Sequence, residues 1–147
     1  MPVTDPTLIV IADDNPGDRL LAIKALRKGG VDNPVLEVED GQQLLELLRG
    51  DTPRGRRVVV FLDINMPRMN GIEALALLKA DPVLKRIPVV MLTTSEADID
   101  LHRAYDLGAN SYLSKPVSFA EFLPRMQQLG LYWTQLVNVP AVPPRPA

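Results

Sequence analysis

The chain has 147 residues, the length of one domain with a core of its own. Hydrophobic residues make up 46% of it and charged residues 23%, which is typical of a folded globular domain and excludes collagen-like, disordered and disulfide-scaffold chains. With no cysteine and one histidine, the chain cannot form disulfides, thiolate zinc sites or multi-histidine metal sites. The net charge of −2 argues against nucleic acid as a partner.

The sequence predicts neither a membrane span nor a secretory signal. The longest unbroken apolar runs, Leu8–Ala12 and Val58–Leu62, are far shorter than the roughly 20 residues that a membrane-spanning helix needs. The first five residues, Met-Pro-Val-Thr-Asp, lack the basic and apolar regions of a signal peptide. We therefore expect a cytoplasmic location and no membrane partner.

Five short apolar runs alternate along the chain with longer stretches of helical periodicity. This alternation is typical of a parallel sheet that helices cover on both faces. The predicted strands are residues 8–12, 35–38, 58–63, 88–92 and 111–113. The predicted helices are residues 16–28, a leucine-rich stretch between Asp40 and Gly50, residues 72–80, residues 96–107, and a helix opened by a capping box of Ser118 and Glu121. The order is a βα unit repeated five times.

The segment after Gly130 has a different composition. Residues 131–137 are apolar, and four of the last eight residues are proline. Because such an end has few ways to pack, we expect an extended, mobile tail. Its 17 residues are too few for an output domain, so we expect any signal to leave through the surface of the single domain.

Polar residues follow four of the predicted strands. They are Asp13 and Asp14 after the first strand, Asp63 at the end of the third, Thr93 after the fourth and Lys115 after the fifth. Parallel α/β sheets place their binding sites at this edge, so we expect the five side chains to converge. Three carboxylates in a small space repel one another unless a cation lies among them. Because neither histidine nor cysteine accompanies them, Mg²⁺ is the expected ion.

A lysine and a hydroxyl group beside this metal suggest that the ligand is a phosphoryl group. Lys115 supplies positive charge and Thr93 a hydrogen bond, and charge neutralisation with positioning is most of what phosphoryl transfer needs. Asp63 is then the candidate nucleophile, because carboxylates form aspartyl phosphates.

The motifs that carry these residues resemble the receiver domain of two-component response regulators. They are Asp13-Asp14, residues 61–67 (FLDINMP), Leu92-Thr93 and residues 112–116 (YLSKP). The intervals of 30 residues from Asp63 to Thr93 and 22 from Thr93 to Lys115 are similar to those of chemotaxis-type receivers. The resemblance implies a flavodoxin-like (βα)5 α/β fold with a doubly wound parallel five-stranded sheet in the strand order 2-1-3-4-5. It covers residues 7–129, which leaves residues 130–147 as a C-terminal extension with a proline-rich tail and no output domain.

The resemblance also implies a role for each matching metal ligand. Asp63 accepts a phosphoryl group from a sensor histidine kinase. Asp14 and Asp63 bind Mg²⁺ directly, Asp13 acts through water, and the backbone carbonyl of Asn65 completes the protein ligands. The protein is then no enzyme in the usual sense, since it catalyses only its own phosphorylation and dephosphorylation.

The resemblance further implies that three residues carry the response to phosphorylation. Thr93 hydrogen-bonds the acyl phosphate, and Lys115 pairs with it. Tyr112 turns inward as Thr93 moves, which reshapes the face made by the fourth helix, the fifth strand and the fifth helix.

Within the family, the chain is most similar to the small stand-alone receivers that partner bacterial phytochromes. The residues concerned are 87–95 (IPVVMLTTS), 104–109 (AYDLGA) and the pair Tyr132-Trp133. This similarity implies a phytochrome as the kinase and a homodimer through the face of the fourth helix, fifth strand and fifth helix together with Tyr132 and Trp133. A downstream protein or phosphotransfer protein completes the expected partners, and the sequence does not identify it.

Simpler interpretations of these residues remain open at this point. Asp13 and Asp14 could cap a helix, Lys115 could be a surface lysine, and Thr94 could stand in for Thr93. Tyr112 could be a packing aromatic side chain. We interpret His102, Arg54, Arg56 and Arg57 as solvated.

Two other functions compete with the phosphoacceptor. A pseudo-receiver that only binds partners would lack an acceptor or a metal ligand, whereas all of them are present here. An aspartyl-phosphate phosphatase or phosphotransferase carries a second aspartate two positions after the nucleophile, and Asn65 occupies that position. Nucleotide-binding loops of the G-x-x-x-x-G-K-[ST] and G-x-G-x-x-G types follow none of the strands.

Overall fold

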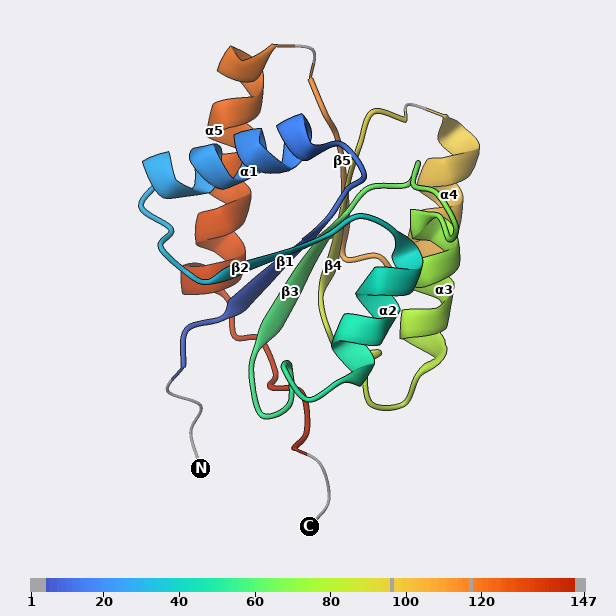
Figure 1. The fold of residues 1–147 in the computed structure, drawn as a ribbon. Helices are drawn as coiled ribbons and strands as arrows, with labels where there is room; N and C mark the ends of the chain where they lie inside the picture. Colours follow the sequence, from blue (N-terminus) through green and yellow to red (C-terminus); the bar gives the residue numbers. More distant parts are fainter. Residues whose placement is uncertain (1–4, 96, 117, 145–147) are drawn as a thin grey trace.

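The computed structural model describes residues 5–95, 97–116 and 118–144 (Figure 1). The strands are β1 (Leu8–Ala12), β2 (Val35–Val38), β3 (Val58–Leu62), β4 (Val89–Thr93) and β5 (Ser111–Ser114). The helices are α1 (Pro16–Lys28), α2 (Gly41–Arg49), α3 (Gly71–Ala80), α4 (Asp98–Asp106), α5 (Phe119–Leu131) and the short π-helix η1 (Tyr132–Leu136). No helix in the described part of the chain is long and apolar enough to cross a membrane.

All five strands are parallel and lie in the order β2-β1-β3-β4-β5, which confirms the predicted flavodoxin-like topology. The three inner strands are buried along their whole length, whereas β2 and β5 at the edges are half-buried. This difference explains the sequence pattern, because a strand covered on both faces has no solvent side and carries apolar residues throughout.

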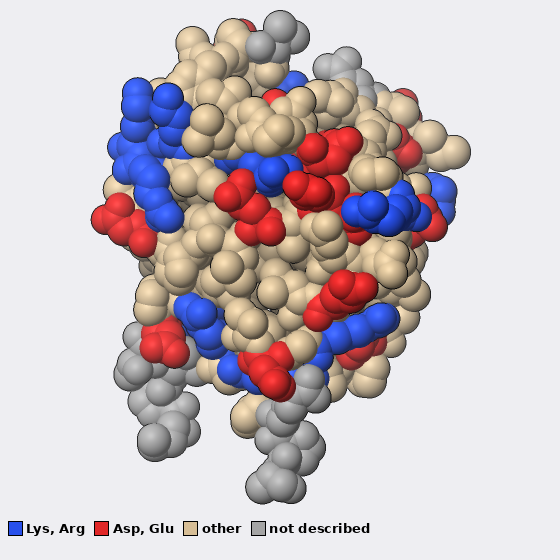
Figure 2. Space-filling view, in the orientation of Figure 1, with Lys and Arg blue, Asp and Glu red and all other residues tan. Residues whose placement is uncertain are grey.

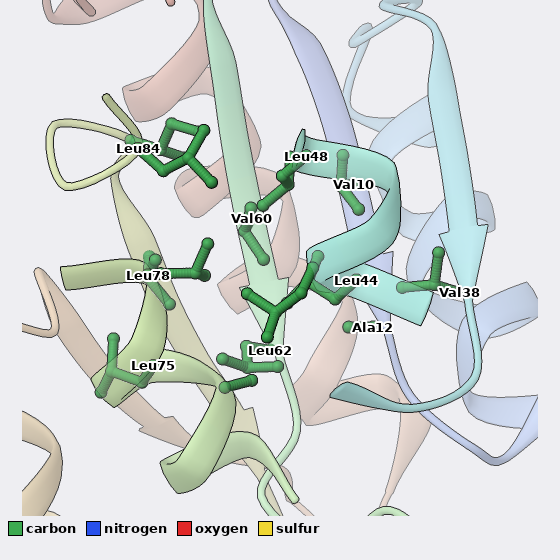
Figure 3. Packing of buried hydrophobic residues seen from close by; sticks show 14 of the residues in the cluster. Val10, Ala12, Val38, Leu44, Leu48, Val60, Leu62, Leu75, Leu78 and Leu84 are labelled. Carbon is green, nitrogen blue, oxygen red and sulfur yellow. The ribbon is translucent and has the colours of Figure 1, made fainter. Parts of the chain in front are cut away.

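Helices cover both faces of the sheet, α1 and α5 on one side and α2, α3 and α4 on the other (Figure 1). Successive residues of β1 alternate between the two cores: Val10 packs with the α2–α3 side and Ile11 with the α1–α5 side. Figure 3 shows the first of these cores, in which Leu44 and Leu48 of α2 lie over Val10 and Val60 of the sheet. The layers hold the carboxyl ends of the strands at one edge.

Most predicted boundaries agree with the structure to within two residues. The helix expected from residue 96 begins at Asp98, and Glu96 itself lies outside the described residues. Ser118 caps α5, because its side chain accepts a hydrogen bond from the backbone N of Glu121 at 3.2 Å, and this contact is one half of the predicted capping box. Asp63 follows β3 and is not part of it.

The expectation of an extended, mobile tail after Gly130 is wrong for much of this segment. The chain stays helical to Leu136, and Val139 and Val142 further on are only 7% and 2% exposed. Val142 exchanges two backbone hydrogen bonds with the loop before β3, to Arg56 and from Gly55, at 2.7 and 2.8 Å. Val139 belongs to the α1–α5 core and Val142 to the α2–α3 core, so the tail closes both cores at the amino-terminal end of the sheet.

This packing predicts a stability effect for Val142→Ala. The change removes two buried methyl groups, and we expect the free energy of unfolding to fall by about 1–3 kcal/mol. Urea denaturation measures it, with Pro144→Ala as the control because Pro144 is exposed in the same segment. Equal midpoints for wild type and Val142→Ala would mean that the tail does not contribute to the core.

Candidate functional site

The predicted site residues meet at the carboxyl edge of the sheet, where the strand order reverses between β1 and β3. Backbone hydrogen bonds continue the strand pairing into the site. The N–H of Asp63 donates to Ala12 at 2.9 Å, and that of Lys115 to Thr93 at 2.7 Å. These bonds fix the backbone positions of Asp63 and Lys115. The register of the strands therefore brings the site side chains together.

Three carboxylates form the centre of the site. One oxygen atom from each of Asp13, Asp14 and Asp63 lies within 4.8 Å of the others. Asp13 and Asp63 are 4% and 7% exposed, and Asp14 is open to solvent. A cation can therefore reach this group from the Asp14 side, and the set of hard oxygen donors suits Mg²⁺.

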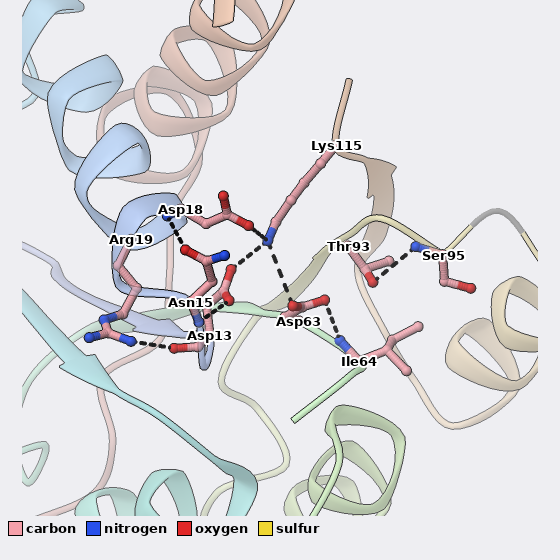
Figure 4. A network of polar contacts seen from close by, with 9 residues as sticks. All are labelled: Asp13, Asn15, Asp18, Arg19, Asp63, Ile64, Thr93, Ser95 and Lys115. Carbon is pink, nitrogen blue, oxygen red and sulfur yellow. Dashed lines mark hydrogen bonds and ion pairs between the residues drawn. The ribbon is translucent and has the colours of Figure 1, made fainter. Parts of the chain in front are cut away.

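Local hydrogen bonds orient the two buried carboxylates (Figure 4). The backbone N–H of Asn15 donates to Oδ1 of Asp13 at 2.9 Å, and the backbone N–H of Ile64 donates to Oδ1 of Asp63 at 2.8 Å. The side chain that caps α1 is that of Asn15, which accepts from the backbone N of Asp18 at 3.0 Å. Helix capping therefore does not account for Asp13 or Asp14.

Lys115 directly follows β5, and its side chain reaches into the cluster of three carboxylates. Its Nζ contacts Oδ2 of Asp13 and lies 3.0 Å from Oδ2 of Asp18 and 3.6 Å from Oδ2 of Asp63 (Figure 4). The lysine side chain is 9% exposed, so it is no ordinary surface lysine. Burial alone would lower the pKa of Lys115, but the hydrogen bond that Lys115 donates to Asp13 and the negative charges of Asp63 and Asp13 outweigh it and raise the pKa. The ammonium group stays charged at neutral pH.

The single positive charge of Lys115 does not balance the negative charges of the carboxylates around it. Burial raises the pKa of Asp13, and the hydrogen bonds with Lys115 and Asn15 offset that effect only in part. The negative charge of Asp63 adds to the effect of burial. The site thus favours a second positive charge, as a bound divalent cation would provide.

Thr93 and Tyr112 both hold the loop after β4. Thr93 is fully buried and its Oγ1 accepts a hydrogen bond from the backbone N of Ser95 at 3.3 Å, whereas Thr94 is exposed, which favours Thr93 as the site residue. The Tyr112 hydroxyl donates to the backbone carbonyl of Ser95 at 3.0 Å. Burial raises the pKa of Tyr112, which keeps this hydroxyl protonated. Ser95 therefore links the two predicted switch residues.

Asn65 lies exposed at the start of the loop that joins β3 to α3. The loop closes where the backbone N–H of Gly71 donates to the carbonyl of Ile64 at 2.8 Å. A Cβ on Gly71 would lie 2.0 Å from the carbonyl oxygen of Asp63, so only glycine permits this approach. The predicted phosphoacceptor therefore depends on a glycine eight positions later.

The sequence analysis missed an ion pair that holds this loop. Arg68 adopts a left-handed backbone conformation with φ of 63° and donates from Nε to Oδ2 of Asp40 at 2.9 Å. Asp40 is fully buried at the N-cap of α2, where its Oδ1 accepts from the backbone N of Gln43 at 2.8 Å. Beside it, the backbone N–H of Gly41 donates to Met69 at 2.9 Å. The pairing of residues 28 positions apart leaves no local pattern in the sequence.

The surface outside the site carries charges of both signs. Figure 2 shows acidic and basic side chains interspersed over the face that it presents. His102 is exposed on α4, in agreement with its interpretation as solvated. Arg56 and Arg57 donate to the backbone carbonyls of Pro6 and Asp5, which gives these arginines a role in holding the N-terminal segment.

Comparison with known protein families settles the family. The model of the response regulator receiver domain matches residues 9–127. The chain belongs to this family. The match confirms the resemblance inferred from the motifs, and the receiver is a signalling phosphoacceptor domain rather than a classical enzyme. The exact limits of residues 7–129 and 130–147 stay predictions.

Two curated relatives resemble the chain over most of their own length. Response regulator Rcp1 of Synechocystis is 32% identical over 141 residues, which cover 92% of this chain and 95% of Rcp1. The probable methanogenesis regulatory protein FilR2 of Methanothrix harundinacea is 37% identical over 131 residues, covering 88% of this chain and 84% of FilR2.

Solved structures extend the likeness to phytochrome response regulators. A response regulator receiver domain from Rhodospirillum rubrum superposes with a TM-score of 0.86 at 39% identity, covering 92% of this chain and 99% of that one. The phosphorylated cyanobacterial phytochrome response regulator RcpA has a TM-score of 0.84 at 32% identity, covering 94% and 100%. The Mn²⁺-bound form of Rcp1 has a TM-score of 0.83 at 31% identity, covering 92% and 100%.

The Arg68–Asp40 pair predicts a pH-dependent stability effect for Asp40→Asn. Burial opposes ionisation of Asp40, but the hydrogen bonds from Gln43 and Arg68 outweigh it and hold the pKa below its usual value. The ionised pair therefore adds stability above the usual pKa of about 4, and this stability is lost as the pH falls through the lower folded value. We expect Asp40→Asn to lower the free energy of unfolding by about 1–3 kcal/mol near neutral pH, and by less in acid.

Denaturation by urea over a pH series measures this difference. Asp32→Asn is the matched control, because Asp32 is exposed. If Asp40→Asn lowers the free energy of unfolding equally at every pH, the negative charge of Asp40 is not the source of the stability that the pair provides.

Proposed function

We propose that the receiver accepts a phosphoryl group on Asp63 from a sensor histidine kinase, with Mg²⁺ bound by the side chains of Asp13, Asp14 and Asp63 and the backbone carbonyl of Asn65. The observation that carries this proposal is the meeting of three carboxylate oxygens within 4.8 Å beside the buried ammonium group of Lys115. Two similar structures support it: RcpA in a phosphorylated form and Rcp1 in a Mn²⁺-bound form.

The contacts of Asp63 favour Oδ2 as the nucleophilic oxygen. Oδ1 accepts from the backbone N–H of Ile64, whereas Oδ2 faces Lys115. Attack of the carboxylate on phosphorus forms the P–O bond as the P–N bond to the kinase histidine breaks, and the electron pair leaves with the imidazole, which then takes up a proton.

The neighbouring residues stabilise the charge that this reaction moves. Mg²⁺, when bound, neutralises part of the charge on the carboxylates and the phosphoryl oxygens. Lys115 places its ammonium group beside a phosphoryl oxygen, and the buried hydroxyl of Thr93 donates a hydrogen bond to another. These contacts support autocatalysed phosphorylation and dephosphorylation, and no external substrate is needed.

The contacts of Ser95 supply a route for the switch. A hydrogen bond from Thr93 to the phosphoryl group would take its hydroxyl away from the backbone of Ser95, which Thr93 and Tyr112 hold from two sides. Tyr112 then loses its place at the loop and turns inward, and the face of α4, β5 and α5 changes with it. The sequence predicted both residues, and the link through Ser95 is new.

We infer the partners from the relatives and from one apolar surface. Similarity to phytochrome response regulators supports a phytochrome-type kinase in the cytoplasm, and a downstream protein or phosphotransfer protein would read the switched face. A hollow of about 490 Å³ lies beside β5 and α5, lined by residues that include Leu113, Tyr132 and Leu136. Leu136 is 75% exposed, and the rings of Tyr132 and Trp133 meet edge to face at 5.1 Å. This surface supports a homodimer through the face of α4, β5 and α5 with the Tyr132–Trp133 segment.

Two alternatives have less support. A pseudo-receiver that only binds partners does not explain why the carboxylates, Thr93 and Lys115 converge. A phosphatase or phosphotransferase needs a general acid two positions after Asp63, and Asn65 in this place cannot supply a proton in that role.

The proposal predicts one Mg²⁺-dependent phosphoryl adduct on the wild-type protein incubated with acetyl phosphate. Asp63→Asn should take up none, because the nucleophilic oxygen is lost, and EDTA should abolish the reaction of the wild type. Intact-mass spectrometry measures the adduct. Labelling of Asp63→Asn at the wild-type rate would refute the site, and no labelling of a wild type that binds Mg²⁺ would favour the pseudo-receiver.

Lys115→Ala should separate phosphorylation from the switch. We expect the variant to fold, to bind Mg²⁺ and to be phosphorylated, because its carboxylates remain. Hydrogen exchange across α4, β5 and α5 should then differ little between its two states, whereas it should change in the wild type. Lys24→Ala, at an exposed position of α1, is the control. If phosphorylation changes hydrogen exchange in Lys115→Ala as much as in the wild type, Lys115 has no part in the switch.

A further inference from the structure

Asp18 is the partner of Lys115 that neither the sequence motifs nor the proposed chemistry uses. It is the third residue of α1, and its Oδ2 lies 3.0 Å from Nζ of Lys115 (Figure 4). The two residues are 97 positions apart, so their contact joins the start of α1 to the end of β5. An acidic residue in the first turn favours a helix by itself. That role does not require the carboxylate to meet the lysine.

The carboxylates within 4.0 Å of Lys115 Nζ, among the described residues, are those of Asp13, Asp18 and Asp63. The proposed function assigns Asp13 to the metal and Asp63 to the phosphoryl group. Asp18 is therefore the one carboxylate of the three that can keep Lys115 once the other two are engaged. Nζ also lies closer to Asp18, at 3.0 Å, than to Asp63, at 3.6 Å.

A lysine ammonium group has three N–H donors. Each donor that points at a carboxylate is unavailable to a phosphoryl oxygen, so Asp18 competes with the phosphoryl group for Lys115. A cavity of about 110 Å³, lined in part by Asp13, Asp18 and Lys115, leaves room beside the ammonium group for a change of position. The side chain of Asp18 is 37% exposed, so solvent weakens its contact with Lys115. The contact still attracts the ammonium group, but Lys115 can leave it for a phosphoryl oxygen.

We propose that Asp18 is a positioning residue that holds Lys115 toward α1 in the unphosphorylated protein and thereby lowers the level of phosphorylation. This inference rests on the proposed function, in which Lys115 pairs with the phosphoryl group on Asp63. Asp18 then sets how much of the protein is phosphorylated at a given concentration of donor, without touching the phosphoryl group itself.

Phosphorylation of Asp18→Asn by acetyl phosphate and Mg²⁺ tests this role. The phosphorylated-to-unphosphorylated ratio at steady state, measured by intact mass, should rise about two- to five-fold over the wild type, because a neutral amide holds the ammonium group less strongly. Glu121→Gln is the matched control: Glu121 has the same third position in α5, is exposed, and is not among the three carboxylates around Lys115. Its ratio should equal that of the wild type.

A double-mutant cycle with Lys115→Ala distinguishes competition for the lysine from simple charge repulsion. If Asp18 acts through Lys115, Asp18→Asn should change the ratio by less than about two-fold in the Lys115→Ala background. An equal gain in both backgrounds, or an Asp18→Asn ratio at or below the wild type, would overturn the inference and leave the proposed function intact. A wild type that takes up no phosphoryl group would overturn both.

Discussion

The ammonium group of Lys115 is the charge on which the rest of the site depends. The sheet register pairs Ala12 with Leu62, so the next residues of both strands, Asp13 and Asp63, must come together whatever their charge. Mutual repulsion of buried carboxylates is costly, and a lysine from β5 supplies the nearest compensation. That compensation is incomplete, because a single lysine faces several carboxylates. The unbalanced charge is what makes the site receptive to a divalent cation.

The two sides of the site are held with different strength. On the β1–β3 side, the ion pair of Arg68 with buried Asp40 and the close approach of Gly71 to Asp63 fix the loop that follows β3. On the β4–β5 side, the loop after β4 depends on the contacts of Ser95 with Thr93 and Tyr112 at 3.3 and 3.0 Å. Under the proposed function, a phosphoryl group between the two sides would therefore rearrange the second side and leave the first in place, in keeping with the proposed change at α4, β5 and α5.

The fold was predictable where residues interact with near neighbours in the chain. The apolar runs of the inner strands and the caps at Asn15 and Ser118 act over a few residues, and the structure places them as expected. The C-terminal segment was not predictable in this way. Its composition indicates an extended chain, but Val142 is buried in the α2–α3 core, and that core exists only once the layers have formed.

For the site, the sequence by itself determined which chemistry is available: carboxylates after β1 and β3, a hydroxyl on the last residue of β4 and a lysine after β5, each at the end of a recognisable strand. Parallel pairing then brings strand ends together, so Asp13, Asp63 and Lys115 follow from the pattern. Only the tertiary structure decided that Asp18 shares Lys115 and that Arg68 meets Asp40. These contacts join helices and loops 97 and 28 residues apart. Their geometry depends on how helices pack on the sheet, which no local residue pattern records.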